Sequence, residues 1–183
     1  MREIKSKRGF STAEMLLATL ILSFSMMLLS NGAAVIQRIY RRTLAATDAQ
    51  MILSQAEIRL RNDLSMAEKC DLDADGETVT QYYISSVGYK LITHPDRDRY
   101  PSQERYPDGV LYREDDAGNL DQFSLKNVSR LEGLQIPNAP TIQYADGCFT
   151  VSGLQVEYSD GRGSTLPFSS PAIVIRALQS VTS

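Results

Sequence analysis

The apolar segment near the N-terminus constrains the fold of this chain more than any other part of its sequence. Residues 10–36 are long enough for a membrane-spanning helix, which needs about 20 mostly apolar residues. Residues 15–29 contain no charged side chain. Their polar residues are Thr19, Ser23 and Ser25. Glu14 places a carboxylate close to the start of the segment. The pattern predicts a transmembrane helix, and Glu14 needs a separate explanation.

Basic residues on both sides of the segment predict its direction across the membrane. Arg2, Lys5, Lys7 and Arg8 precede it. Arg38, Arg41 and Arg42 follow it and weaken the bias without reversing it. Because cytoplasmic flanks carry the excess of basic residues, we expect a cytoplasmic N-terminus and an exported remainder. The net charge of the chain is -3, which gives no sign of a basic surface that would bind nucleic acid. We therefore expect no nucleic-acid partner.

A cleaved secretory signal is an alternative interpretation, because it also combines a basic start, an apolar centre and small residues at its cleavage site. Residues 31–34 could serve as that site, and the mature chain would then begin near Val35. Two features count against it. The apolar run is long for a signal peptide. Glu14 would also add an insertion cost of about 2.5–3.5 kcal/mol at mid-membrane, and less near the edge, which a disposable segment has no reason to carry.

Helical periodicity continues beyond the apolar segment. One face repeats at helical spacing: Leu53, Ala56, Leu60, Leu64 and Ala67. The outer side offers two i,i+4 ion pairs: Glu57 with Arg61, and Arg59 with Asp63. No proline precedes Pro95, so we expect one helix from Phe10 to near Glu68. A bend or local melting would cost least at Asn31-Gly32.

The rest of the chain alternates short runs of β-branched and aromatic residues with turn residues. These runs predict strands near residues 78–85, 88–93, 109–114, 120–125, 148–153, 154–159 and 172–178. Residues 114–119 and 159–163 are typical of hairpin turns. We therefore predict an α+β fold. Its long N-terminal helix is transmembrane in the first half and packs in the second half on a mostly antiparallel sheet.

The residues at the start of the apolar segment carry a family resemblance. The stretch KRGFSTAE resembles the processing site of type IV prepilins and type II secretion pseudopilins. In that family a short basic leader ends in a glycine, an apolar residue follows, and a glutamate stands five places after the glycine. Here the glycine is Gly9, the apolar residue is Phe10 and the glutamate is Glu14. The resemblance implies that a prepilin peptidase cuts after Gly9 and methylates the new N-terminus. It also implies a helical stem that continues into a β-rich head.

The same resemblance implies how the chain is organised and where it acts. Residues 1–9 are a cleaved leader, 10–36 the transmembrane and filament-core half of the helix, 37–69 the half packed on the sheet, and 70–183 the exported β-rich part. The chain would enter the bacterial inner membrane with a cytoplasmic N-terminus, and later join a periplasmic or cell-surface filament. The implied partners are the peptidase, other pilin or pseudopilin subunits, the inner-membrane assembly platform and, before assembly, membrane lipid. No cofactor is implied, and the chain is not expected to be an enzyme.

The resemblance also implies an assembly role for Glu14. In such filaments the glutamate meets the N-terminal amine of a neighbouring subunit, which is the amine of Phe10 after cleavage. Opposite charges attract strongly in a low-dielectric core. The competing interpretation is that Glu14 only reaches the lipid headgroups from the helix start.

Two stretches indicate a minor subunit. GVLYRE and VSGLQVEYSDGRG are similar to J-type minor pseudopilins and W-type minor pilins, which implies a place in initiation or at the filament tip. The chain departs from many relatives in STAE, where they carry bulkier residues before the glutamate. This departure leaves the cleavage elements intact.

Cys70 and Cys148 are an even pair of cysteines in the part expected to reach an oxidising compartment. A disulfide between them would join the helix end to the sheet and add roughly 2–4 kcal/mol of stability. The alternative is two separate buried thiols. The compartment favours the bond.

Other candidate sites are weaker. Asp71, Asp73 and Asp75 match the first positions of a calcium-binding loop, but Tyr82 stands where its bidentate glutamate belongs. An acidic turn explains them better, and we assign no metal site. His94 has no second histidine or cysteine nearby, and no serine lies in a nucleophile-elbow context. Nothing in the pattern supports catalysis.

Residues 94–108 contain three prolines, three arginines and two tyrosines, which is typical of a solvated loop or of a contact surface. Two broader alternatives to a filament subunit stay open. One is a membrane-anchored binding module that does not polymerise. The other is a secreted β-domain released by ordinary signal cleavage. The mature N-terminus distinguishes them: N-methylated Phe10, intact Met1, or a start near Val35.

Overall fold

The structure is a computed structural model of the 183-residue chain. It describes all residues except 1–10, 103–104, 124–132, 160–162, 179 and 183. The chain divides into two compact units, Met1–Thr43 and Leu44–Ser183. Helix α1 (Thr12–Ser65) contributes to both units, and the described strands all belong to the second. The expected α+β class, with a long N-terminal helix packed on antiparallel sheets, is confirmed.

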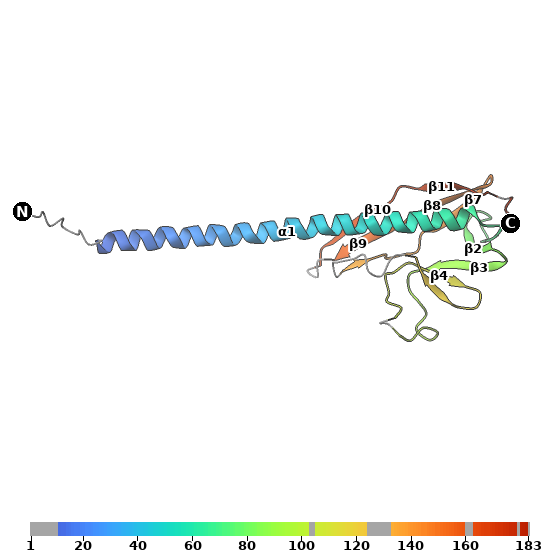
Figure 1. The fold of residues 1–183 in the computed structure, drawn as a ribbon, viewed down its shortest axis with the longest axis horizontal. Helices are drawn as coiled ribbons and strands as arrows, with labels where there is room; N and C mark the ends of the chain where they lie inside the picture. Colours follow the sequence, from blue (N-terminus) through green and yellow to red (C-terminus); the bar gives the residue numbers. More distant parts are fainter. Residues whose placement is uncertain (1–10, 103–104, 124–132, 160–162, 179, 183) are drawn as a thin grey trace, which may run out of the picture. The chain divides into compact units, whose positions relative to one another are not determined.

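Helix α1 is a single element of 54 residues, as expected from the absence of proline. Figure 1 shows it unbroken from its blue start to its green end. Gly32 lies inside the helix without ending it. The helix stops at Ser65, slightly before the expected end, where the Met66 N–H donates to the carbonyl oxygen of Asp63 at 3.1 Å. This shorter bond tightens the last turn and satisfies one of its free carbonyl groups.

The helix face predicted from periodicity is buried. Four of its residues lie in α1 and the fifth, Ala67, follows the helix end. All five are at most 8% exposed: Leu53, Ala56, Leu60, Leu64 and Ala67. They belong to one hydrophobic core with the inner faces of the strands, whose largest buried side chains include Tyr82, Leu111, Phe123 and Phe149. Helix residues three or four apart and alternate residues of the strands point into this core, as the periodicities of the two kinds of element require.

Three sheets pack on this helix face, where one was expected. The five-stranded sheet has the order β1 (Lys69–Leu72), β2 (Val79–Ile84), β3 (Val87–Ile92), β4 (Tyr112–Asp115) and β5 (Leu120–Gln122). A three-stranded sheet has the order β10 (Thr165–Ser169), β9 (Gln155–Ser159) and β6 (Leu134–Gln135). The other has the order β11 (Ile173–Arg176), β8 (Cys148–Ser152) and β7 (Thr141–Ala145). All pairings between these strands are antiparallel.

The two expected hairpins are present. Strands β4 and β5 pair around residues 115–119, and β9 pairs with β10. Part of the second turn, 160–162, lies outside the described residues. A third tight turn joins β7 to β8 through Asp146 and Gly147, whose φ angles are 51° and 75°. Asp-Gly is the sequence that such a type I′ turn favours.

The turn between β2 and β3 uses less suitable residues. Ser85 and Ser86 have φ angles of 51° and 68°, and Ile84 pairs with Val87 across them. A type I′ turn needs positive φ at both central positions. A residue with a Cβ atom is strained there by roughly 1–2 kcal/mol. The hairpin therefore forms despite its turn sequence.

Replacing Ser86 with glycine should stabilise the unit Leu44–Ser183, called the β-rich unit below, by about 0.5–1 kcal/mol. Relief of strain exceeds the extra chain entropy that glycine gives the unfolded state. Thermal unfolding of the full chain in detergent, followed by the near-ultraviolet circular dichroism of its tyrosines, measures the change. Ser54→Gly is the matched control, because Ser54 is exposed inside α1 and glycine there should destabilise the chain by a similar amount. A lower midpoint for Ser86→Gly would contradict the strain argument.

One of the two expected ion pairs on α1 is confirmed and the other is wrong. The Arg61 guanidinium lies 3.1 Å from the Glu57 carboxylate. Arg59 does not pair with Asp63, because its guanidinium donates to a carbonyl oxygen at the end of β5 at 2.6 Å. The Asp63 carboxylate is then available to a partner from the sheet.

That partner is Arg113 on β4, whose guanidinium lies 2.6 Å from the Asp63 carboxylate. The side chains of Arg113 and Asp63 are 22% and 14% exposed. Tyr82 donates its hydroxyl to Asp63 at 3.2 Å, and the guanidinium lies 4.4 Å from the centre of the Tyr89 ring. Burial, with the Asp63 charge beside it, raises the pKa of Tyr82 above its usual range. This cluster joins the end of α1 to the five-stranded sheet.

Candidate functional site

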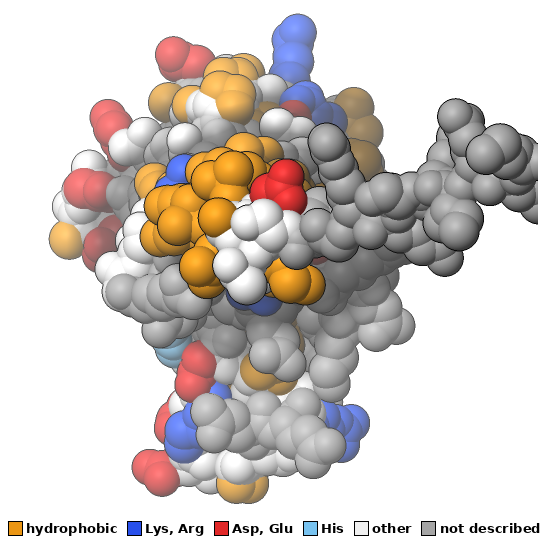
Figure 2. All heavy atoms as spheres, turned by 90° about the vertical axis from the view of Figure 1, so that its left-hand side faces the viewer, with side chains coloured by type: hydrophobic (Ala, Val, Ile, Leu, Met, Phe, Trp, Pro, Cys, Tyr) orange, Lys and Arg blue, Asp and Glu red, His pale blue; other side chains and the backbone are white. Residues whose placement is uncertain are grey.

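The first part of α1 carries its apolar side chains outward on all sides. Every large apolar residue from Met15 to Tyr40 is at least 53% exposed. Figure 2 faces this end of the chain and shows hydrophobic side chains gathered there. The helix is long and apolar enough to cross a membrane. Because a helix that is apolar all round is stable only when buried, this surface needs lipid or other apolar helices around it.

The polar side chains between residues 15 and 29 form hydrogen bonds within the helix. The hydroxyls of Thr19, Ser23 and Ser25 each donate to a carbonyl oxygen about one turn earlier, at 2.8–2.9 Å. Such bonds leave no free hydroxyl donor for an apolar environment to accommodate. From residue 11 to residue 37, Glu14 is the one charged side chain.

Glu14 forms part of the helix start. The backbone N–H of Ser11 donates to the Glu14 carboxylate at 2.9 Å. The carbonyl oxygen of Ser11 accepts the first helical bond, from the N–H of Met15 at 3.1 Å. A glutamate that reaches back to the N-cap residue from three positions later is half of a capping box. The sequence contains its signal, STAE, which our interpretation of Glu14 did not use.

The expected processing site lies next to this helix start. Gly9 and Phe10 fall outside the described residues, so cleavage between them stays a prediction. The described chain begins at Ser11 and enters α1 at Thr12.

Cys70 and Cys148 are free thiols, so the expected disulfide is not formed in this structure. Cys70 is fully buried in β1, not at the helix end where the sequence interpretation placed it. Cys148 is half-buried at the start of β8, as expected, and β8 belongs to a different sheet. Burial raises the pKa of the Cys70 thiol, which keeps it protonated and unreactive. The two cysteines occupy separate environments, which their count alone could not reveal.

An alkylating reagent should therefore modify Cys148 in the folded chain well before Cys70. Cys70 becomes accessible only when the core opens. Mass spectrometry of alkylated peptides against time measures both rates, and Cys148→Ser is the control that leaves only the slow site. Two thiols should be labelled after denaturation without a reductant. Finding none in that denatured sample would show a disulfide and contradict the structure.

The acidic turn expected at residues 71–77 is present, and it joins β1 to β2. The Asp75 carboxylate accepts hydrogen bonds from the backbone N–H and the hydroxyl of Thr78, at 2.8 and 2.5 Å. The Asp71 carboxylate accepts one from the Tyr83 hydroxyl at 2.6 Å. These carboxylates therefore bond within the hairpin. Across the described part of the chain, no group of three or more His, Cys, Asp or Glu side chains is placed to hold a metal ion.

The described residues of the loop at 94–108, which leave out 103 and 104, are held in place by hydrogen bonds. Its ends meet where the N–H of Gly109 donates to the carbonyl oxygen of Thr93 at 3.0 Å. Nε2 of His94, which is exposed, lies 3.0 Å from the carbonyl oxygen of Pro137. Long loops whose ends are close together and whose side chains pack internally are stable surface features.

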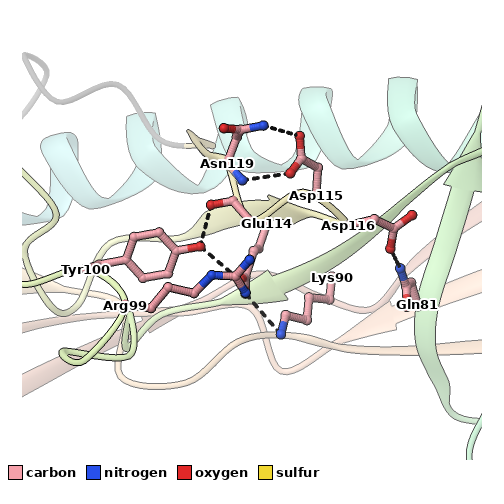
Figure 3. Close-up of polar contacts among 9 residues, drawn as sticks. Gln81, Lys90, Arg99, Tyr100, Glu114, Asp115, Asp116 and Asn119 are labelled. Carbon is pink, nitrogen blue, oxygen red and sulfur yellow. Dashed lines mark hydrogen bonds and ion pairs between the residues drawn. The ribbon is translucent and has the colours of Figure 1, made fainter.

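Glu114 on β4 fixes this loop to the five-stranded sheet. Figure 3 shows Lys90, Arg99 and Tyr100 directed at its carboxylate. The Arg99 guanidinium lies at 2.8 Å, the Tyr100 hydroxyl at 2.9 Å and the Lys90 amine at 3.0 Å. The Glu114 side chain is 5% exposed. Burial and the bond to Glu114 raise the pKa of Tyr100 to about 12. Our sequence interpretation missed this cluster, because its members come from two strands and a loop.

Comparison with known proteins identifies no relative. The chain matches no protein-family model, no curated protein and no solved structure. The functional interpretation therefore depends on the apolar helix, on Glu14 and on the residues that precede them.

Proposed function

We propose that this chain is a minor subunit of a type IV pilus or type II secretion filament, processed by a prepilin peptidase and assembled through its N-terminal helix in initiation or at the tip. The observation that carries the proposal is the exposed apolar surface of α1 up to residue 37, on which Glu14 is the one charged group. Lipid can cover this surface while the chain is in the membrane, and the apolar helices of neighbouring subunits can cover it after assembly. The basic leader and the Gly9-Phe10 junction support processing at this point.

Charge pairing is the proposed mechanism of assembly. Cleavage after Gly9 exposes an amine at Phe10, and in the filament this amine meets the Glu14 carboxylate of a neighbouring chain. In the membrane the carboxylate has no such partner, and its burial is costly. The pair offsets that cost in the low-dielectric filament core. It thereby favours extraction from the bilayer and fixes the axial offset between chains.

Membrane insertion precedes assembly in this proposal. The leader keeps the N-terminus in the cytoplasm and the β-rich unit is exported from the inner membrane. Ordinary signal cleavage at residues 31–34 would cut α1 in its middle, because the helix continues without a break through these residues.

A membrane-anchored binding module that does not polymerise is the second candidate. The hydrogen bond between Glu14 and the Ser11 N–H favours it, because a carboxylate that caps its own helix has a role without any partner chain. The two candidates differ in whether the charge of Glu14 or only its hydrogen bond is needed.

Replacing Gly9 with leucine should leave the chain in the membrane with its leader attached. A peptidase that reads this site needs a residue without a side chain to let the backbone enter a tight cleft. Mass spectrometry of the N-terminal peptide from membrane fractions measures the matured share. Ser6→Leu is the matched control, since it alters the leader without touching the junction and should mature normally. Normal maturation of Gly9→Leu would remove the proposed processing step.

A further inference from the structure

Three arginines follow the apolar segment and share one face of α1. Arg38, Arg41 and Arg42 are spaced i, i+3, i+4. All three are exposed, and none forms an ion pair or side-chain hydrogen bond with another described residue. Along the helix the nearest acidic residues are Glu14 and Asp48, and Asp48 is buried. The chain therefore presents three uncompensated guanidinium groups at the end of its apolar segment.

The position of these arginines conflicts with the orientation that the leader sets. Basic residues on the exported side oppose membrane insertion with a cytoplasmic N-terminus. Three unpaired charges on one helix face therefore call for an anionic partner on that side of the membrane. Guanidinium groups bind phosphate with paired hydrogen bonds, which makes phosphate the matching anion.

The length of α1 places the arginines at the level of lipid phosphates. With Glu14 at the inner boundary, about 20 residues of helix cross the hydrocarbon, so the outer boundary falls near Ala34. At about 1.5 Å per residue, Arg38 and Arg42 then lie about 6 and 12 Å beyond it. Side chains on a helix lean toward its N-terminus, which here is toward the bilayer. Tyr40 is 63% exposed between them, where aromatic residues favour the interface.

We propose that Arg38, Arg41 and Arg42 form a binding face for the phosphate groups of anionic phospholipids in the outer leaflet of the membrane. This inference rests on the membrane stage of the proposed function and adds a regulator to it. The bound lipids hold the chain at a fixed depth, and they must be released before α1 leaves the bilayer. Membrane lipid composition therefore sets how readily the chain is extracted.

The test uses the full chain in nanodiscs of equal phosphatidylcholine and phosphatidylglycerol. Native mass spectrometry counts the lipids that stay bound to the released protein. The wild-type chain should retain phosphatidylglycerol preferentially, by on the order of five-fold for each arginine engaged. The variant Arg38→Gln, Arg41→Gln, Arg42→Gln should lose most of this preference, and the part that remains belongs to the four basic residues of the leader. Inorganic phosphate added to the nanodiscs should not displace the lipid.

The matched control removes the same charge elsewhere. Arg61, Arg105 and Arg176 are exposed residues of the β-rich unit, and their combined replacement by glutamine should leave the lipid preference unchanged. Equal lipid retention by the wild-type chain and the Arg38, Arg41, Arg42 variant would overturn the inference. Displacement of the bound phosphatidylglycerol by inorganic phosphate would show that the arginines bind phosphate in general, and would contradict the proposal that they bind phospholipid. The result is independent of filament assembly, which is measured separately through Glu14.

Discussion

Replacing Glu14 with glutamine should leave the chain processed, inserted and folded, but remove nearly all of it from sheared filaments. Glutamine keeps the side-chain length and can still accept the hydrogen bond of the Ser11 N–H, because capping boxes use either residue. Only the charge is lost. In the membrane a neutral amide costs less to bury than a carboxylate. In the filament the amine of the neighbouring Phe10 loses its partner, which costs roughly 3–5 kcal/mol, or about 10²- to 4 × 10³-fold in assembly.

The matched control is Glu14→Ala, which removes both the charge and the capping bond. If Glu14 only caps the helix, glutamine is tolerated and alanine weakens the helix start. If Glu14 pairs with an amine, both variants stay in the inner membrane. Immunoblots of sheared filaments and of membrane fractions measure the distribution. Wild-type amounts of Glu14→Gln in filaments would contradict the pairing role. In a chain at the filament tip, with no chain above it, that result would not contradict filament membership.

Replacing Arg113 with methionine should destabilise the β-rich unit by about 3 kcal/mol. The substitution leaves the Asp63 carboxylate, which is 14% exposed, without its counter-charge. Losing one partner of a buried ion pair costs roughly 3–5 kcal/mol, and the partial exposure of Arg113 places this pair at the lower end. Asp121, the other acidic partner of Arg113, is 59% exposed and stays hydrated. Denaturant unfolding, followed by the tyrosine circular dichroism, measures the change.

The control for this prediction is the double variant Arg113→Met with Asp63→Leu. Removing both charges leaves no uncompensated group, so most of the lost stability should return. The hydroxyl of Tyr82 then loses its acceptor, which accounts for a remaining loss of about 1 kcal/mol. A single Arg113→Met variant within about 0.5 kcal/mol of the wild type would show that the pair does not hold the helix to the sheet.

Local patterns predicted the helix and its buried face because their causes are local. The absence of proline before Pro95 permits one long helix, and the spacing from Leu53 to Leu64 defines the side that packs. The acidic residues of the β1–β2 hairpin predicted a turn for the same reason. The capping bond between Ser11 and Glu14 is equally local, so STAE could have revealed it.

Contacts between distant residues could not be predicted in this way. Asp63 and Arg59 have the spacing of a helical pair, but Arg113, fifty residues beyond Asp63, takes the carboxylate. Glu114 looked like an ordinary strand residue until the loop supplied Arg99 and Tyr100.

Short and edge strands also gave no clear sequence signal. Strand β10 contains Pro167, which argues against a strand and is tolerated here because β10 lies at a sheet edge. Strand β6 has only two residues. The division into three sheets depends on these strands, which is why a single sheet was predicted.

The mature N-terminus tests the proposed function most directly. The chain would be expressed in a bacterium that assembles such filaments, and the N-terminal peptide of the membrane and filament fractions would be sequenced by mass spectrometry. We expect it to begin at Phe10, with a methyl group on its amine. An intact Met1 would contradict processing and favour a membrane anchor, and a start near Val35 would indicate ordinary signal cleavage.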